Sequence, residues 1–139
     1  MKQKFFELKL KTNGQKLYNF TDKTISWINE NSLNNGILNL SIQHTSASLI
    51  VQENADPDVQ TDLITYFDRL VPMDEKSYIH QSEGKDDMPA HIKSALTNNQ
   101  ISLSVKKKEL LLGTWQGIYL FEHRIESQVR KIIHHFIGD

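Results

Sequence analysis

The chain has no cysteine among its 139 residues. A disulfide framework, a thiolate nucleophile and a cysteine-ligated zinc site are therefore excluded, and a transition-metal site has to be built from His, Asp and Glu side chains. A cysteine-free chain is also compatible with a reducing compartment. Long apolar runs are lacking too, since no stretch approaches the roughly 18 residues of a membrane span. We predict a soluble cytoplasmic protein with no membrane partner.

Charge of one sign is not in excess either. The chain has 16 basic and 17 acidic residues, which gives a formal net charge of −1. Proteins that bind nucleic acid usually concentrate positive charge on one face, and the single basic run, Lys106 to Lys108, is best explained as a solvated turn. No nucleic-acid partner is expected. A glycine-rich phosphate loop is also missing, so any phosphate has to be bound by other groups.

The apolar pattern predicts one α+β domain over residues 1–139. Alternation from Phe6 to Leu10 indicates a half-buried strand. Helices are expected to begin at Asp56-Pro57 and at Pro89, because aspartate caps free backbone amides and proline tolerates the first helical turn. The predicted order is β-β-α-β-β-α-α-β-β-β, with about three helices packed against largely antiparallel sheet.

One histidine stands where a strand is expected to end. In "SIQHTSASLIVQENA", alternation places His44 on the same face as Leu40 and Ile42, so that it ends an apolar row. Small hydroxyl residues follow it directly, and the carboxylate of Glu53 follows nine positions later. A buried structural histidine, a metal ligand and an acid–base group all fit this position.

Two further histidines flank an acidic, glycine-containing segment, "HQSEGKDDMPAH". Three neutral imidazoles and a water form a common open catalytic metal site, and Glu83 or Asp87 can orient the rings. His44, His80 and His91 are therefore candidate ligands. The alternative is that His80 is a solvated loop residue and His91 an ordinary residue in the first turn of a helix.

The remaining histidines have simpler explanations. His134 and His135 are neighbours in a predicted strand, so they point to opposite faces and are expected to be structural.

His123 lies in "FEHR", after an apolar strand. A charged triplet at the end of a strand is either a polar surface or an anion site. Arg124 can bind a phosphate or carboxylate with two parallel hydrogen bonds, or form an exposed ion pair with Glu122 or Glu126.

The segment "GTWQG" combines a large aromatic ring with an amide between two glycines. Glycine within a strand often marks a bulge or a close approach of the backbone. A place in the core explains Trp115 as well as a place in a site does. Gln116 is harder to assign to the core, because a buried amide needs hydrogen-bond partners.

Together, the segments "QHTSASL", "DPDVQTDL", "YIHQSEGKDDMPAHIKSAL" and "LLLGTWQGIYLFEHR" resemble the YjbQ family. The resemblance runs from Phe5 to Gly138, and the "EHRI" ending is similar to the subgroup of the bacterial YjbQ protein. It implies a compact α+β fold, a homotrimer with polar pockets between subunits, and a cluster that contains His44, His80 and His91.

Some proteins of this family are described as secondary thiamine-phosphate synthases. The resemblance thus implies a small phosphorylated substrate and a reaction that joins a pyrimidine methyl diphosphate to a thiazole phosphate and releases diphosphate. Such a site has to stabilise anionic oxygens, for which a divalent metal is a candidate cofactor, either zinc or a similar ion, or magnesium bound with the substrate. The alternative is a non-catalytic trimeric module that binds a metal or a small anion.

These considerations give three overlapping sets of expected site residues. The catalytic set is His44, His91, Glu53 and Gln116. The substrate- or anion-binding set is Thr45, Ser46, Lys85, Trp115 and Arg124. The metal-binding set is His44, His80 and His91.

Overall fold

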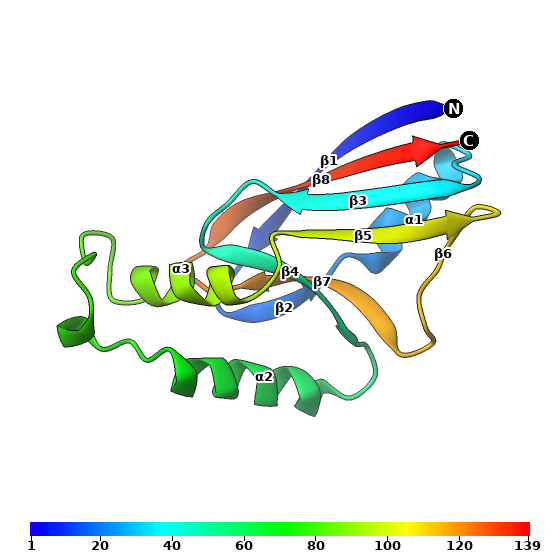
Figure 1. Ribbon diagram of the computed structural model, residues 1–139. Helices are drawn as coiled ribbons and strands as arrows, with labels where there is room; N and C mark the ends of the chain where they lie inside the picture. The colour runs from blue at the N-terminus through cyan, green and yellow to red at the C-terminus, as the bar shows by residue number, and fades with distance from the viewer.

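The computed structural model describes the backbone of residues 1–139 and every side chain except that of Glu75. Figure 1 shows two sheets accompanied by helices. In chain order the elements are β1 (Lys2–Thr12), β2 (Lys16–Asn19), α1 (Thr21–Glu30), β3 (Gly36–Ile42), β4 (Ala47–Glu53), α2 (Pro57–Leu70), the short 3-10 helix η1 (Glu75–Ser77), α3 (Asp87–Leu96), β5 (Gln100–Lys106), β6 (Glu109–Leu110), β7 (Gln116–Glu122) and β8 (Gln128–Gly138).

The predicted α+β class with three α-helices and antiparallel sheet is confirmed. The larger sheet has the order β1-β8-β3-β5-β6 and the smaller one the order β2-β7-β4, with antiparallel pairing throughout. The predicted order lacks one strand, because the two-residue strand β6 and β7 are separate elements. Among the described residues, no helix has the length and apolar composition that a membrane crossing requires.

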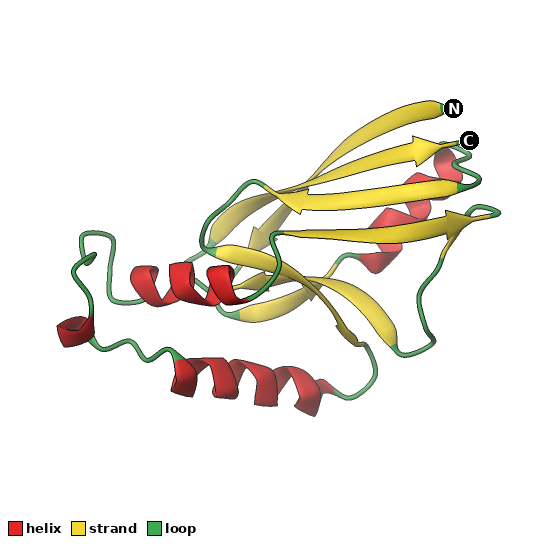
Figure 2. Ribbon diagram, viewed as in Figure 1, coloured by secondary structure: helices red, strands yellow, loops and turns green.

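The two helices that carry or neighbour the acidic segment lie together at one end of the molecule, away from the chain termini (Figure 2). As predicted, Asp56 caps α2, where its side chain accepts a hydrogen bond from the backbone N–H of Asp58 at 2.9 Å, and Pro57 is the first helical residue. α3 begins at Asp87 and not at Pro89. Asp87 therefore belongs to the first turn of α3, one turn before His91.

The main core lies between the two sheets and α1. Ile132, His134 and Phe136 of β8 are fully buried, as the alternation along this strand requires. Leu40 of the neighbouring strand β3 is also fully buried. The two predicted faces of β8 are confirmed, because His135 is only partly buried and stacks on Phe5 with 4.1 Å between ring centroids.

A buried ion pair joins the two sheets. Glu122, at the end of β7, is 0% exposed, and both its oxygens accept hydrogen bonds from Arg130 of β8, at 2.7 and 2.5 Å. Thr12 of β1 donates to the same carboxylate at 2.7 Å. Arg130 also donates to the hydroxyl of Ser46 at 3.0 Å, in the link between β3 and β4. Hydrogen bonds to ionised groups of this kind are among the strongest in proteins.

His134 is a buried histidine with one satisfied nitrogen. Its Nε2 lies 2.8 Å from the Thr24 hydroxyl, which itself donates to the carbonyl of Phe20 at 3.1 Å, so the hydroxyl accepts from His134 Nε2–H. Its Nδ1 is buried without a partner among the described residues. Burial lowers the pKa of His134 to about 4. The ring is therefore neutral in the folded protein at neutral pH.

We predict that His134 makes the protein sensitive to acid. Its folded pKa lies below the unfolded value of about 6.5, so its contribution to stability is complete above that pH and falls as the pH decreases towards 4. His134→Gln should reduce the loss of unfolding free energy between pH 7 and pH 5 by about 1–2 kcal/mol. The matched control His135→Gln should leave this loss unchanged. Urea unfolding at the two pH values measures both, and equal losses in the two variants would contradict the prediction.

Candidate metal and anion site

Three side chains meet at the start of α3. Asp87 and His91 are four residues apart and therefore lie on one face of the helix, while His80 comes from the preceding loop. The Nε2 atoms of His80 and His91 lie 2.7 and 3.2 Å from the same oxygen, Asp87 Oδ2. One ligand atom from each residue lies within 4.8 Å of the other two. The three groups thus face one small volume.

Arg124 fixes the orientation of Asp87. The carboxylate is 1% exposed, and its second oxygen, Oδ1, accepts from Arg124 Nη1 at 2.8 Å. The same guanidinium donates from Nε to Asp86 Oδ2 at 2.9 Å and from Nη2 to the Glu83 carbonyl at 2.9 Å. The guanidinium of Arg124, which was predicted to bind a phosphate or carboxylate, therefore binds the protein's own carboxylates. Within this structure Arg124 positions Asp87.

Asp86 is held in its ionised form. Burial acts to raise the pKa of Asp86, but the backbone N–H of Ile125 and the side chain of Arg124 both donate to it, and the pKa lies below the usual value. For Arg124, burial acts in the opposite direction to the hydrogen bond and charge of Asp86, which raise its pKa above the usual value. One arginine thus faces two buried carboxylates. The negative charge that remains favours the binding of an additional cation near them.

The hydrogen bonds of His91 show what kind of cation fits. Its Nδ1 lies 3.0 Å from the Thr45 carbonyl oxygen, which can only accept, so Nδ1 carries a proton. A neutral His91 then has its lone pair on Nε2, directed at an oxygen of the Asp87 carboxylate. Two lone pairs 3.2 Å apart repel unless a proton or a metal ion lies between them. Two imidazole nitrogens and one carboxylate oxygen suit zinc and similar divalent ions.

The structure brings His80 and His91 together, with Asp87 in the third place and His44 outside the group. His44 Nε2 accepts a hydrogen bond from the backbone N–H of Lys131 at 2.9 Å. His44 nevertheless lies close by, because it shares with His91 a hollow of about 230 Å³. The residues that line this hollow are His44, Thr45, His91, Ser94, Ala95 and Asn99.

The predicted anion-binding residues differ in accessibility. Thr45 is exposed and lines the hollow. Lys85 is exposed in the acidic loop, and no ion pair of its side chain exists among the described residues. Ser46 is buried, and both its hydroxyl and its carbonyl accept hydrogen bonds from Arg130. Ser46 is therefore part of the interior network, which explains its hydroxyl without a ligand.

Glu53, Trp115 and Gln116 lie at the other end of β4. Glu53 ends this strand and pairs with Gln116 of β7, whereas His44 lies before its first residue. Seven extended residues span about 20 Å, so one chain does not bring these groups to His44. Trp115 is 64% exposed, which excludes a place in the core. The amide oxygen of Gln116 accepts from the backbone N–H of Gly113 at 2.7 Å and closes a local turn.

His123 is an interior residue. It is 1% exposed, and its Nε2 lies 2.9 Å from the hydroxyl of Ser48, which is itself fully buried. Burial, followed by the charges of Lys93 and Arg130, lowers the pKa of His123 to about 3. The ring is neutral and closed to solvent, so it has no access to a ligand.

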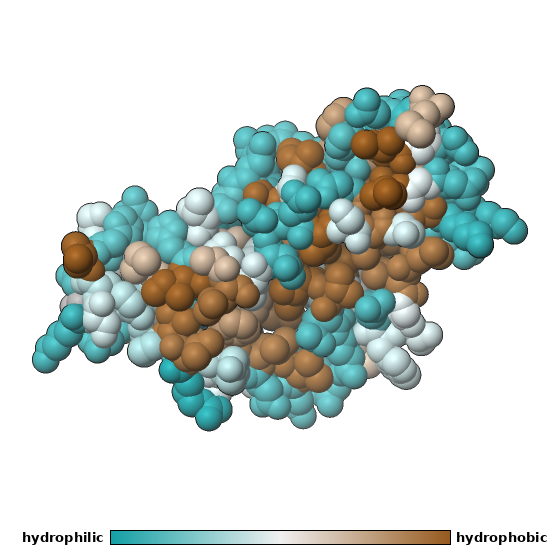
Figure 3. Space-filling model, in the orientation of Figure 1, coloured by the Kyte–Doolittle hydropathy of each residue, from teal (hydrophilic) through white to brown (hydrophobic). Residues whose placement is uncertain are grey.

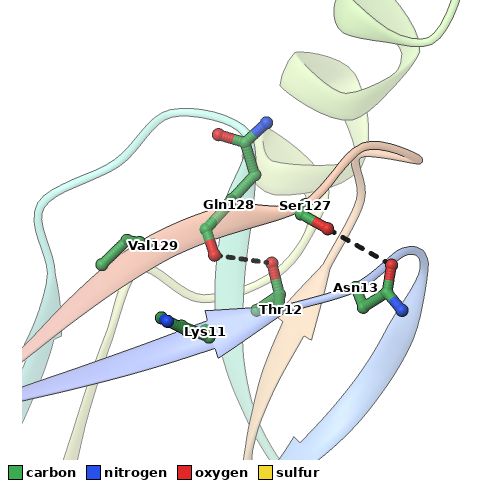
Figure 4. Close-up of a pocket in the computed structure, with 6 residues that line it drawn as sticks. All are labelled: Lys11, Thr12, Asn13, Ser127, Gln128 and Val129. Atoms are coloured by element: carbon green, nitrogen blue, oxygen red, sulfur yellow. Dashed lines mark hydrogen bonds between the residues drawn. The ribbon is translucent and has the colours of Figure 1, made fainter.

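A second and larger hollow, of about 530 Å³, lies where the β1–β2 turn meets the start of β8 (Figure 4). Two hydrogen bonds join residues that line it, one from the Ser127 hydroxyl to the Asn13 side chain and one from the Thr12 hydroxyl to the Gln128 carbonyl. Its lining residues are Lys11, Thr12, Asn13, Ser127, Gln128 and Val129. Because it contains neither a histidine nor a carboxylate, its volume does not make it the site of acid–base or metal chemistry.

Sequence reasoning gave Asp87 only the role of orienting a histidine. The available signal was the four-residue spacing between Asp87 and His91, which places both on one helical face wherever a helix begins at or before Asp87. If α3 begins only at Pro89, as the sequence predicted, Asp87 lies outside the helix and this spacing does not place it beside His91. The contacts between Arg124 and the two aspartates have no local signal, because 37 and 38 residues separate the partners.

Comparisons with known proteins agree on one family. The family model "UPF0047 protein YjbQ-like" matches residues 6–139. The UPF0047 protein YjbQ of Escherichia coli O157:H7 is 45% identical over 132 residues, which cover 94% of this chain and 94% of that protein. A UPF0047 protein of Synechocystis is 46% identical over 132 residues, which cover 95% of this chain and 90% of that protein.

Solved structures show the same fold. A YjbQ/UPF0047 family protein from Clostridium acetobutylicum is 30% identical with a TM-score of 0.84, and the match covers 95% of this chain and 99% of that one. A protein from Sulfolobus solfataricus has a TM-score of 0.85 over 99% of this chain and 100% of that one, at 20% identity. At that identity the likeness shows the fold alone.

We predict that Arg124→Lys weakens zinc binding about 10- to 100-fold, because lysine is a point donor and does not hold Asp87, Asp86 and the Glu83 carbonyl together. Arg69→Lys, at an exposed position on α2, is the control and should bind zinc as the wild type does. Competition against a chromogenic chelator measures both affinities. Wild-type affinity in Arg124→Lys would show that Asp87 needs no such positioning.

Proposed function

The chain belongs to the UPF0047 family of YjbQ-like proteins, and we propose that it binds a divalent metal ion and a small phosphorylated substrate at the start of α3. One observation supports this most strongly: the Nε2 atoms of His80 and His91 both face Asp87 Oδ2, at 2.7 and 3.2 Å. The mixed nitrogen and oxygen donors favour zinc or a similar ion, since magnesium prefers oxygen ligands alone.

As the reaction we propose thiamine-phosphate synthesis. The thiazole nitrogen forms a bond to the methylene carbon of the pyrimidine as the bond from that carbon to oxygen breaks, and diphosphate leaves with the electron pair. When bound, a divalent ion supplies positive charge that stabilises the departing oxygens. In this proposal His91 is fixed by the Thr45 carbonyl, and the free ammonium group of Lys85 is available to bind a phosphate.

Turnover of the two precursors by the purified, zinc-loaded protein tests the activity. We expect formation of thiamine phosphate and diphosphate, and a loss of at least 100-fold in His91→Ala. Arg69→Lys, at an exposed position on α2, should keep wild-type turnover. Turnover that persists in His91→Ala would point to a contaminating enzyme and contradict the assignment. Zinc binding without any turnover would support a non-catalytic metal-binding module instead.

We further propose that the protein is a homotrimer. The face of the larger sheet opposite α1 exposes apolar side chains, among them Ile37 at 59% and Phe5 at 65%. Ile37 pairs with Ile137, which is also exposed. Figure 3 shows apolar residues at several places on one side of the molecule. Burying such surface against other copies is favourable at about 25 cal/mol per Å².

A trimer also offers a role for the residues at the far end of β4. Glu53, Trp115 and Gln116 cannot reach the histidines of their own chain, so a contribution to the site requires a neighbouring copy. In this proposal the exposed indole of Trp115 contacts a substrate that the histidines of another copy bind. The predicted catalytic roles of Glu53 and Gln116 depend on the same arrangement.

The expected mass is about three times that of one chain. Size-exclusion chromatography with light scattering at micromolar concentration measures it directly. A monomer under these conditions would contradict the trimer and remove any role of Glu53, Trp115 and Gln116 at the histidine site, while the metal site within one chain would stand.

A further inference from the structure

The link between β3 and β4 presents a histidine whose hydrogen-bonding state is fixed by the backbone. The Nε2 atom of His44 accepts from the N–H of Lys131 at 2.9 Å, so this nitrogen carries a lone pair and no proton. In a neutral imidazole the proton must then be on Nδ1. Burial, followed by the positive charge of Arg130, lowers the pKa of His44, and these effects favour the neutral ring.

The remaining nitrogen of His44 is available to a ligand. Nδ1 has no hydrogen-bond partner among the described residues, and it is not among the buried atoms that lack one. The ring lines the 230 Å³ hollow. A neutral ring that presents only an N–H group is a hydrogen-bond donor, and it does not offer the lone pair that a metal ligand needs.

Two further polar side chains in the same wall also lack partners. The Thr45 hydroxyl and the Asn99 amide line the hollow and form no side-chain hydrogen bond among the described residues. Ser94 differs, because its hydroxyl donates to the Ala47 carbonyl at 2.8 Å. The hollow thus contains several uncommitted donors and no carboxylate, which suits the oxygens of an anion.

The hollow adjoins the metal-ligand group through His91, which lines the one and belongs to the other. Its volume of about 230 Å³ is below the range of roughly 300–1,000 Å³ that is usual for pockets of drug-sized ligands. It therefore suits a phosphate group or a short phosphorylated fragment. A phosphate in this hollow lies next to the position that a bound metal ion would occupy.

We propose that His44 donates a hydrogen bond from Nδ1–H to a phosphate oxygen of the substrate, in the hollow beside the candidate metal ligands. This inference rests on the proposed function, because it assigns the substrate's phosphate to one part of the same site. It changes the predicted role of His44 from metal ligand to anion donor.

A matched pair of substitutions separates the two nitrogens of the ring. In His44→Asn the side-chain amide lies near the position of Nδ1, so a donor remains in the hollow. In His44→Gln the amide oxygen can accept from the Lys131 N–H in place of Nε2, but no donor occupies the Nδ1 position. Phosphate affinity should fall about 10- to 100-fold in His44→Gln and by no more than about threefold in His44→Asn.

The measurement is calorimetric titration of the zinc-loaded protein with inorganic phosphate, with diphosphate, and with acetate as a carboxylate of similar charge. Tighter binding of diphosphate than of phosphate would assign the hollow to the diphosphate of the substrate, and equal affinities would assign it to a single phosphate group. Preference for acetate would overturn the assignment to phosphate. Thermal unfolding confirms that each variant is folded.

A second measurement needs no variant. Nitrogen-15 NMR of the wild type at pH 7 should show the proton of His44 on Nδ1, although free histidine prefers Nε2–H. A His44 ring protonated on Nε2 would overturn the proposal. Equal phosphate affinity in wild type and His44→Gln would overturn it as well.

The zinc affinity distinguishes the failure of this inference from the failure of the proposed function. We expect both His44 variants to bind zinc as the wild type does, and a large loss in either would make His44 a ligand and overturn the donor role. If the wild type binds no zinc but binds phosphate in a His44-dependent manner, the metal proposal fails and the anion subsite stands.

Discussion

Both parts of the candidate site, the group of His80, Asp87 and His91 and the hollow lined by His44, depend on the carboxylate of Glu122. It is fully buried and accepts four hydrogen bonds: two from Arg130, one from Thr12 and one from the backbone N–H of Arg124. The bond to Arg124 holds the backbone of the residue that positions Asp87. Through Arg130 the same carboxylate reaches Ser46, in the link that carries His44.

A buried ion pair of this kind is not in itself a source of great stability. Removing one partner typically costs about 3–5 kcal/mol, because the other charge remains buried, whereas replacing both partners by apolar groups is often neutral. The contribution of the Glu122–Arg130 pair is better understood as geometric. It holds the end of β7 against β8 and against the link between β3 and β4, through the hydrogen bonds from Arg130 to Glu122 and Ser46.

The sequence predicted those parts of the fold that depend on local rules. The cap at Asp56, the opposite faces of His134 and His135, and the α+β class all follow from periodicity and backbone chemistry, and all are confirmed. The network around Glu122 was not predictable in this way. Glu122 and Arg130 lie on different strands of different sheets, and each on its own fits an exposed strand end equally well.

The same reason limits prediction of the site. The resemblance to the YjbQ family implied a cluster of His44, His80 and His91, and the structure brings His80 and His91 together on Asp87 without His44. The position of Trp115 relative to His44 depends on the length and direction of β4, and a motif search has no information on either. Ser46 looks like its neighbour Thr45 in the sequence, yet one hydroxyl faces Arg130 and the other lines the hollow.

The link between β3 and β4 connects the two halves chemically. The carbonyl of Thr45 fixes the tautomer of His91, which belongs to the metal-ligand group, and the preceding residue, His44, has its own tautomer fixed by Lys131. A shift of this four-residue link therefore affects both the lone pair on His91 Nε2 and the Nδ1–H donor of His44. Because both rings are oriented by backbone groups of neighbouring segments, a metal ion and an anion bound as proposed would be coupled through this link, and by linkage each would change the affinity of the other by the same factor.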